Sequence, residues 1–264
     1  GALPPGLGFD VDSGLISGEP TTAGTFSFTI RANNLIGIDD RTYSVVIGDP
    51  PQNDLFAMRS ILRGGSDYGT SNNQFATKEA GEPNHAGNAG GKSVWWTWAA
   101  TSTNPVRVYT CYQKVVGLNL VNATFDTTLA VYTGFAVNAL TLVAANDDSS
   151  DCLFGTSSSV TFNATKDAVY QFAVDGYNGA SGNVRLSLYQ QQTLTAVLVN
   201  AVGAAGTVTS APAGIDCPGV ACTGSFAPNS MVTLTATAQP GSFFAGWQGG
   251  GCVGFAPDCT VTVA

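Results

Sequence analysis

The chain has little charge and almost none of the residues on which side-chain catalysis relies. Of its 264 residues, 10 are Lys or Arg, 18 are Asp or Glu, and a single one, His85, is histidine. Charged residues make up 11% of the chain, against about 25% in an average soluble protein. The net charge of −8 excludes a nucleic-acid partner, since binding to phosphates requires clustered Lys and Arg.

Long apolar runs are also absent. No uninterrupted stretch reaches the roughly 18 residues that a membrane-spanning helix needs. The first residues carry neither the charged segment nor the small-residue cleavage site of an export signal. We therefore expect no direct insertion into a membrane, and we expect any export signal to lie outside these residues.

Signatures of catalysis are missing as well. Every Ser-His-Asp, Cys-His or His-metal mechanism would have to use His85, which lies in a loop rich in Gly, Pro and Asn. There is no Gly-x-Ser-x-Gly elbow, no His-Glu-x-x-His and no phosphate-binding Gly-rich loop before a helix. We predict that the chain is not an enzyme and that His85 hydrogen-bonds within a structured loop.

What the chain does contain is typical of short strands joined by tight turns. It holds 32 Gly and is 44% hydrophobic, and short alternating segments rich in Val, Thr and aromatic residues are separated by Gly, Pro, Asn and Asp. The sequence predicts an all-β chain of tandem β-sandwich or jelly-roll modules, with a small disulfide-stapled β-repeat and with incomplete modules at both ends.

The cysteines indicate an oxidising compartment. There are six of them, an even number with no Cys-x-x-Cys pair and one histidine to share a metal, so we interpret them as disulfides rather than zinc ligands. Loop length favours the pairs Cys111 with Cys152, Cys217 with Cys222, and Cys252 with Cys259. Other pairings remain open at this point.

Two changes of pattern divide the chain. Gly48-Asp49-Pro50-Pro51 cannot continue a strand ladder, and a second change follows residue 190. We predict domains at 1–48, 51–190 and 192–264. In the second domain we expect strands at Ser93–Ala99, Val106–Cys111, Thr128–Tyr132, Leu140–Ala144, Ser159–Asn163, Tyr170–Asp175 and Asn183–Leu188.

The first domain carries a specific motif. The turn Leu3-Pro4-Pro5-Gly6-Leu7, followed by the Gly-rich run 13–24, resembles the immunoglobulin-like (cadherin-like) repeat of bacterial surface proteins. In that family several strands precede the turn, whereas two residues precede it here. The resemblance implies that half of this sandwich lies outside the sequence.

The other two domains resemble further bacterial modules. Residues 76–87, 93–98, 125–132 and 175–182 look like the pre-peptidase C-terminal type of β-sandwich, which implies an accessory domain rather than a catalyst. In the third domain the Gly206-Thr207-Val208 turn, the Thr-rich run 232–237 and the Gly246-Trp247 pair are similar to the divergent internalin-type B-repeat. That pattern would continue for one more strand after Thr262.

Acidic clusters are the candidate ligand sites. Hard cations take six to eight oxygen ligands, which loops rich in Asp and Asn supply. The candidate calcium ligands are Asp126, Asn146, Asp147, Asp148 and Asp151. Glu79, Glu82 and Asn84 form a weaker candidate set. The alternative for both is an ordinary turn held by side-chain hydrogen bonds to the backbone.

Tryptophans offer a second interpretation. Trp95, Trp96 and Trp98 are candidates for a sugar-stacking platform, but strand alternation places Trp95 on one face and the other two on the opposite face. At least one of these faces must then be core.

Two hypotheses for function remain. The first is a non-catalytic structural or adhesive segment of a bacterial cell-surface or secreted protein, and one form of it is a filament subunit completed by strand exchange between copies. Its partners would be other copies, neighbouring repeats, a polysaccharide, or a host or matrix protein. The alternative is an accessory carbohydrate- or protein-binding module of a secreted hydrolase.

Overall fold

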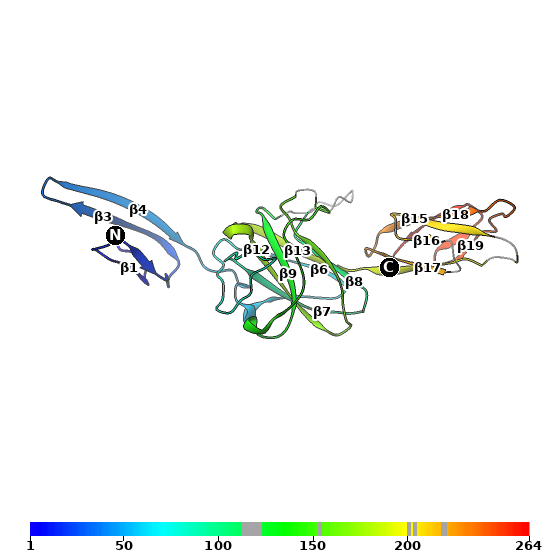
Figure 1. Ribbon diagram of the computed structural model, residues 1–264, viewed down its shortest axis with the longest axis horizontal. Helices are drawn as coiled ribbons and strands as arrows, with labels where there is room; N and C mark the ends of the chain where they lie inside the picture. Colours follow the sequence, from blue (N-terminus) through cyan, green and yellow to red (C-terminus); the bar gives the residue numbers. More distant parts are fainter. Residues whose placement is uncertain (112–122, 153–154, 200–201, 203–204, 218–220, 264) are drawn as a thin grey trace.

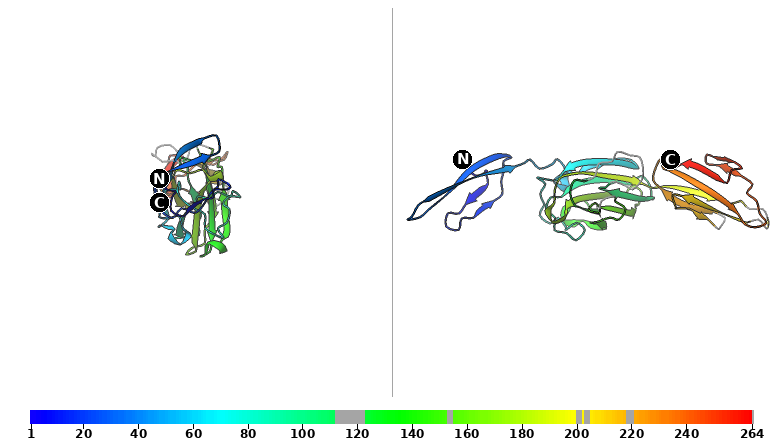
Figure 2. Two further views of the ribbon diagram at one scale, coloured as in Figure 1. Left: turned by 90° about the vertical axis from the view of Figure 1, so that its left-hand side faces the viewer. Right: turned by 90° about the horizontal axis from the view of Figure 1, so that it is seen from above.

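The computed structural model describes residues 1–111, 123–152, 155–199, 202, 205–217 and 221–263. Within these residues all regular structure is β-strand apart from three single-turn 3₁₀ helices, so the all-β prediction is confirmed. The strands form three modules that follow one another in a row (Figures 1 and 2). No helix in the described part of the chain is long and apolar enough to cross a membrane.

The first module consists of two antiparallel hairpins. Its strands are β1 (Leu7–Phe9), β2 (Ile16–Gly18), β3 (Gly24–Asn33) and β4 (Ile38–Ile47). β1 pairs with β2 and β3 pairs with β4. Phe26 and Phe28 lie on one face of the longer hairpin together with Val45 and Tyr43. Of these four side chains only Phe28 is buried, with 7% of its surface exposed.

The middle module is a two-sheet sandwich. Its strands are β5 (Ser60–Leu62), β6 (Ser66–Asn72), β7 (Val94–Ala99), β8 (Pro105–Tyr109), β9 (Thr127–Thr133), β10 (Thr141–Asn146), β11 (Ser159–Asn163), β12 (Val169–Gly176) and β13 (Asn183–Gln190), with 3₁₀ turns η1 (Phe56–Met58), η2 (Val137–Ala139) and η3 (Tyr177–Gly179). One sheet has the order β10-β9-β12-β7-β5 and the other β11-β8-β13-β6.

The central strands of the five-stranded sheet, β7, β9 and β12, are buried on both faces. The sheet's inner face, which includes Trp96, Trp98 and Phe172, packs against the other sheet. Its outer face carries Trp95 and Tyr132 and is covered by Phe56 and by the loop that contains His85. β7 is therefore apolar at nearly every position, as expected for a strand without a solvent face.

All seven strands expected in this module are present, with ends that shift by one or two residues. Two further strands, β5 and β6, were not expected. β5 is three residues long, and β6 reads Ser-Asp-Tyr-Gly-Thr-Ser-Asn, which lacks the apolar alternation that marks a strand.

The third module is a smaller sandwich. Its strands are β14 (Gln192–Val197), β15 (Gly206–Ala211), β16 (Asp216–Cys217), β17 (Ala221–Phe226), β18 (Met231–Ala238), β19 (Trp247–Gly249), β20 (Cys252–Gly254) and β21 (Asp258–Thr262). The sheet β16-β15-β18-β21 faces the two-stranded sheet β14-β17, and β19 and β20 form a separate hairpin. Val208, Phe226 and Val232 lie in the core between them.

The two junctions between modules are both held by contacts. Between the middle and third modules only Gln191 separates β13 from β14, and its N–H donates to the Pro105 carbonyl at 2.7 Å. The preceding residue, Gln190, is 1% exposed, and its side chain bonds Thr101 and Ser102.

At the other junction, the backbone of Gly48 lies on the Phe75 ring. A Cβ added at Gly48 would stand 2.1 Å from Phe75 Cδ2, so this position requires glycine. Pro50 and Pro51 follow and restrict the backbone further.

Three disulfides staple the second and third modules: Cys111–Cys152, Cys217–Cys222 and Cys252–Cys259. These are the pairs that loop length favoured. The first closes a separation of 41 residues, and the other two close separations of 5 and 7. The long-range bridge therefore constrains the unfolded chain most.

We predict that a Cys111→Ser/Cys152→Ser variant unfolds its middle module about 4 kcal/mol more easily, on the chain-entropy model. The measurement is urea unfolding followed by tryptophan fluorescence, because three of the four tryptophans are buried in that module. Cys217→Ser/Cys222→Ser is the matched control and should leave this transition in place. An unchanged midpoint in the first variant would mean that packing alone holds the middle module.

Candidate metal centre

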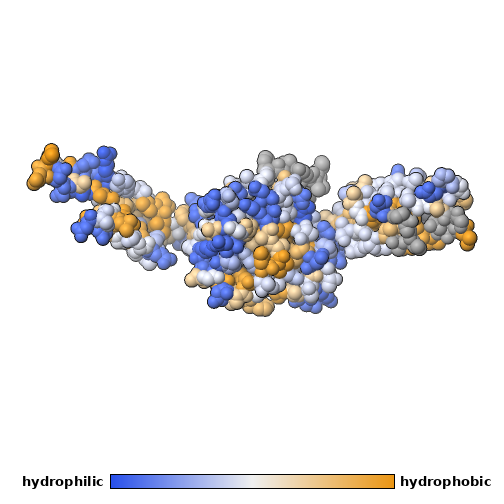
Figure 3. All heavy atoms as spheres, viewed as in Figure 1, coloured by the Kyte–Doolittle hydropathy of each residue, from blue (hydrophilic) through white to orange (hydrophobic). Residues whose placement is uncertain are grey.

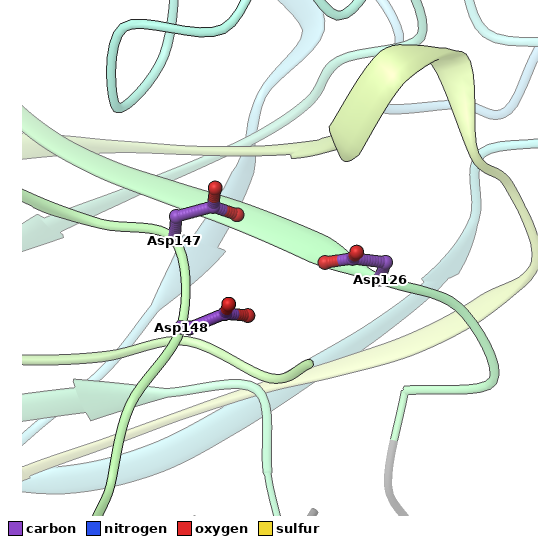
Figure 4. Close-up of side chains that lie close together, drawn as sticks. All are labelled: Asp126, Asp147 and Asp148. Atoms are coloured by element: carbon purple, nitrogen blue, oxygen red, sulfur yellow. The ribbon is translucent and has the colours of Figure 1, made fainter. Parts of the chain in front are cut away.

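Three carboxylates from two strand ends converge at one edge of the middle module. Asp126 immediately precedes β9, and Asp147 and Asp148 immediately follow β10. Because β9 and β10 are antiparallel, with Asn146 opposite Leu129, the start of one strand meets the end of the other. One carboxylate oxygen from each of the three lies within 4.8 Å of the others, and the groups face a common space (Figure 4).

A buried hydroxyl network fixes the loop that carries Asp147. Ser158 Oγ donates to the Asp147 carbonyl at 2.7 Å and lies 3.0 Å from Thr127 Oγ1. Thr127 Oγ1 is in turn 2.8 Å from Thr110 Oγ1. All three hydroxyl residues are at most 1% exposed. These buried groups therefore fix the backbone that carries the acids.

Two of the five expected ligands have other partners. Asn146 accepts the Ser159 N–H and donates to the Asp148 carbonyl, both at 3.0 Å. Asp151 pairs with Arg107 at 3.0 Å with its side chain 65% exposed. The structure thus brings together Asp126, Asp147 and Asp148, whereas Asn146 holds the neighbouring backbone and Asp151 pairs with Arg107 outside the cluster.

The three acids repel one another. Burial, together with the Asp148 charge, raises the pKa of Asp126 above its ordinary value of 3.8. Burial raises the pKa of Asp147 in the same direction, with further contributions from Asp148 and Asp126. Asp126 Oδ1 and Asp147 Oδ1 are both buried without a hydrogen-bond partner, which costs free energy unless a cation or a proton satisfies them.

The donor set suits a hard cation. Three carboxylates without any His or Cys match the oxygen preference of Ca²⁺ or Mg²⁺ and not the nitrogen and sulfur preference of zinc. Ca²⁺ tolerates irregular geometry and accepts bidentate carboxylates, whereas Mg²⁺ demands an octahedron. Ca²⁺ therefore fits these three residues better.

The weaker acidic set is a structural network. Glu79 accepts the Phe56 N–H, Glu82 accepts the Glu79 N–H and lies 2.9 Å from His85 Nε2, and Asn84 accepts from Lys78. These oxygens already have protein donors. The ordinary-turn alternative describes this set.

His85 closes the loop over the outer face of the five-stranded sheet. Its side chain is 0% exposed, and Nδ1 lies 2.8 Å from the Tyr132 hydroxyl. Burial and the Glu82 carboxylate raise the pKa of Tyr132. His85 Nε2 lies 2.9 Å from Glu82 Oε1, so both ring nitrogens of His85 have a buried partner. A fully enclosed His85 cannot contact a substrate. Its hydrogen bonds agree with the prediction that His85 bonds within a structured loop.

The tryptophan platform is not available. Trp95 and Trp96 are 0% exposed and Trp98 is 1% exposed. Both faces of β7 are core, whereas strand alternation alone had left one face open. No tryptophan of this strand can stack on a sugar.

Sequence reasoning missed the residues that position the site. Thr110 lies in the expected strand Val106–Cys111, whereas Thr127 and Ser158 each lie one residue before an expected strand. Ser and Thr are also common on exposed strand faces, so nothing singled these residues out. Asp175 was also missed: it is 0% exposed and accepts the N–H groups of Gly91, Lys92 and Gly176 at 2.7–2.9 Å. An Asp at a strand end beside a Gly-rich loop was the available signal.

Comparison with known proteins finds a family match for one part of the chain. Residues 1–48 match the sequence family described as Putative Ig domain. No curated protein matches the chain. The family match covers the first module alone, and it supports the immunoglobulin-like part of the expected resemblance.

The raised carboxyl pKa values give a pH dependence of known sign. The folded state holds these protons more tightly than the unfolded chain, so without a cation the fold loses stability as pH rises from about 4 toward neutral.

We predict that Asp147→Asn raises the melting temperature of the chelator-treated protein at pH 7 and flattens its pH profile between about 4 and 7. Asp151→Asn is the matched control, since Asp151 lies outside the cluster. Identical profiles for Asp147→Asn and the parent would contradict this account.

Proposed function

We propose that the chain is a non-catalytic structural or adhesive segment of an extracellular bacterial surface or secreted protein. The observation that carries the proposal is the architecture: three β modules in a row, one of them matching an Ig domain family, with three disulfides and with contacts at each junction. Such a row holds its two ends apart. Disulfides and an Ig-like module support an oxidising, extracellular location.

The junctions support a spacer role. A linker of flexible Gly and Ser would let modules rotate freely, but here one module's last strand leads into the next module's first strand across Gln191. Gln190 is anchored by both its backbone and its side chain. We expect this one-residue connection to restrict how far the third module rotates against the middle one.

Calcium belongs to the same proposal. We expect the ion at Asp126, Asp147 and Asp148 to neutralise the buried carboxylates and to tie the start of β9 to the end of β10. The Cys111–Cys152 bridge ends four residues beyond Asp148 and ties the following segment to the end of β8. Bridge and ion would stiffen the same edge of the sandwich.

A filament formed by strand exchange is the further form of this proposal. In the first module, β3 and β4 pair only with each other, so each keeps a free edge. Free strand edges are templates for a strand from another copy.

One observation favours the alternative of an accessory binding module. The outward face of the sheet β11-β8-β13-β6 exposes Tyr68 by 55%, with the Arg185 guanidinium 3.7 Å from its ring centre. Tyr109 and Tyr189 lie on the same face. Exposed Tyr and Arg are enriched at binding surfaces, so a polysaccharide or protein ligand would bind here rather than at the tryptophans.

We predict that calcium raises the melting temperature of the middle module at pH 7. A ligand at about 100 times its dissociation constant stabilises by about 2.7 kcal/mol, and calorimetry with added Ca²⁺ or with chelator measures the difference. The gain should shrink as the pH falls toward 4, because protons compete for the same oxygens.

The matched variants separate the site from general ion effects. Asp147→Asn should abolish the calcium gain, whereas Asp151→Asn should retain it. Equal gains in both variants, or no gain in the parent, would leave the acids as a solvated turn and remove calcium from the proposed function.

A further inference from the structure

The tip of the β3–β4 hairpin presents apolar side chains at a place where polar residues are the rule. The turn Asn34-Leu35-Ile36-Gly37 is held by the Asn34 side chain, whose Oδ1 accepts the N–H groups of Ile36 and Gly37 at 2.8 and 3.0 Å. Leu35 is 107% exposed and Ile36 is 96% exposed. A rigid turn of this kind does not collapse onto its own module, so its apolar side chains stay in water.

A groove with matching chemistry lies in the third module. It has a volume of about 1060 Å³ and runs between β14 and the sheet formed by β15 and β18. Among the described residues that line it are Leu194, Leu234, Phe244 and Trp247, and none of the lining side chains is charged. At its rim Phe243 is 86% exposed and Phe255 is 84% exposed.

Tip and groove lie toward opposite ends of the molecule. Figure 1 shows the β3–β4 turn at one extreme of the row and the loop after β18, which contains Phe243, at the other. Figure 3 shows hydrophobic surface at both extremes. One copy therefore cannot satisfy its groove with its own tip.

We propose that the Leu35-Ile36 tip of one copy docks into the third-module groove of the next copy. The contact joins two different surfaces of the same chain, so it is head-to-tail and can propagate from copy to copy. It names the partner for the proposed structural role and rests on that role, but it is independent of the calcium site.

Charge favours a second copy as the occupant. The chain carries a net charge of −8, so most pairs of surfaces on two copies repel each other at low ionic strength. The residues 33–38 and the groove lining are both uncharged. The tip and the groove can therefore come together without electrostatic repulsion between them.

The available area predicts a weak contact. A buried aromatic side chain accounts for about 150–250 Å², so Phe243 and Phe255 provide about 300–500 Å². With a comparable area from the tip, the total is about 600–1,000 Å², which is below the roughly 1,200 Å² of stable specific interfaces and in the range of weak, transient ones. Neither element has to unfold for this contact to form, and every strand of the described residues keeps its present pairing.

The test is sedimentation velocity of the full chain from about 5 to about 500 µM, the range for a weak contact. Leu35→Ser/Ile36→Ser removes the tip, and Phe243→Ser/Phe255→Ser removes the groove rim. Phe135→Ser/Leu142→Ser is the matched control, since these side chains are 75% and 58% exposed in the middle module. Melting curves confirm that each variant is folded.

We expect the parent and the control to form a concentration-dependent series of oligomers and each test variant to lose association at least tenfold. An equal mixture of the two test variants should form dimers and no larger species, because one retains the groove and the other the tip. A monomeric parent, association that survives loss of the tip, or a mixture without dimers would overturn the proposal. The calcium experiment would stand under any of these results.

Discussion

The middle module depends on the burial of both faces of one sheet. The inner face of β7 is covered by the second sheet. Among the described residues, its outer face is covered by the segment around Phe56 and the loop that carries His85, with Val137 and Leu140 packed against the same cluster. That loop has no regular strand of its own, so side-chain hydrogen bonds hold it closed, among them the Glu82–His85–Tyr132 bonds and the Asp175 bonds to Gly91 and Lys92. Loss of either set would expose Trp95 and leave a buried charge without a partner.

The same sheet places the acidic cluster. β9 and β10 form its far edge, and their ends meet where the sandwich opens to solvent. Hydroxyl groups below the cluster fix the backbone, and the disulfide to Cys111 limits the following segment. The backbone therefore keeps the three carboxylates close together, where their charges repel one another.

Much of the fold follows from the sequence, because alternation and turn residues are local signals. They predicted the all-β class and the strands of the middle module from β7 to β13, while loop length favoured the disulfide pairs that the structure has. They missed β5 and β6, whose residues are too few or too polar to show a period. They could not show that both faces of β7 are core, since that depends on a loop closing from a distance.

The candidate site was predictable in part. Asp126 and the pair Asp147 and Asp148 were named because acids in loops offer oxygens, but sequence could not separate them from Asn146 and Asp151, whose partners come from β11 and β8. The immunoglobulin-like resemblance of the first domain is supported by the family match. The resemblances to pre-peptidase and internalin-type modules, like the domain boundaries, stay predictions.

The central claim is that the modules form a stiff row, and small-angle X-ray scattering of the full chain tests it most directly. The account predicts a pair-distance distribution with a long tail that one extended conformation, the row of Figure 1, reproduces. A compact particle, or a curve that only a broad ensemble of freely rotating modules fits, would contradict it.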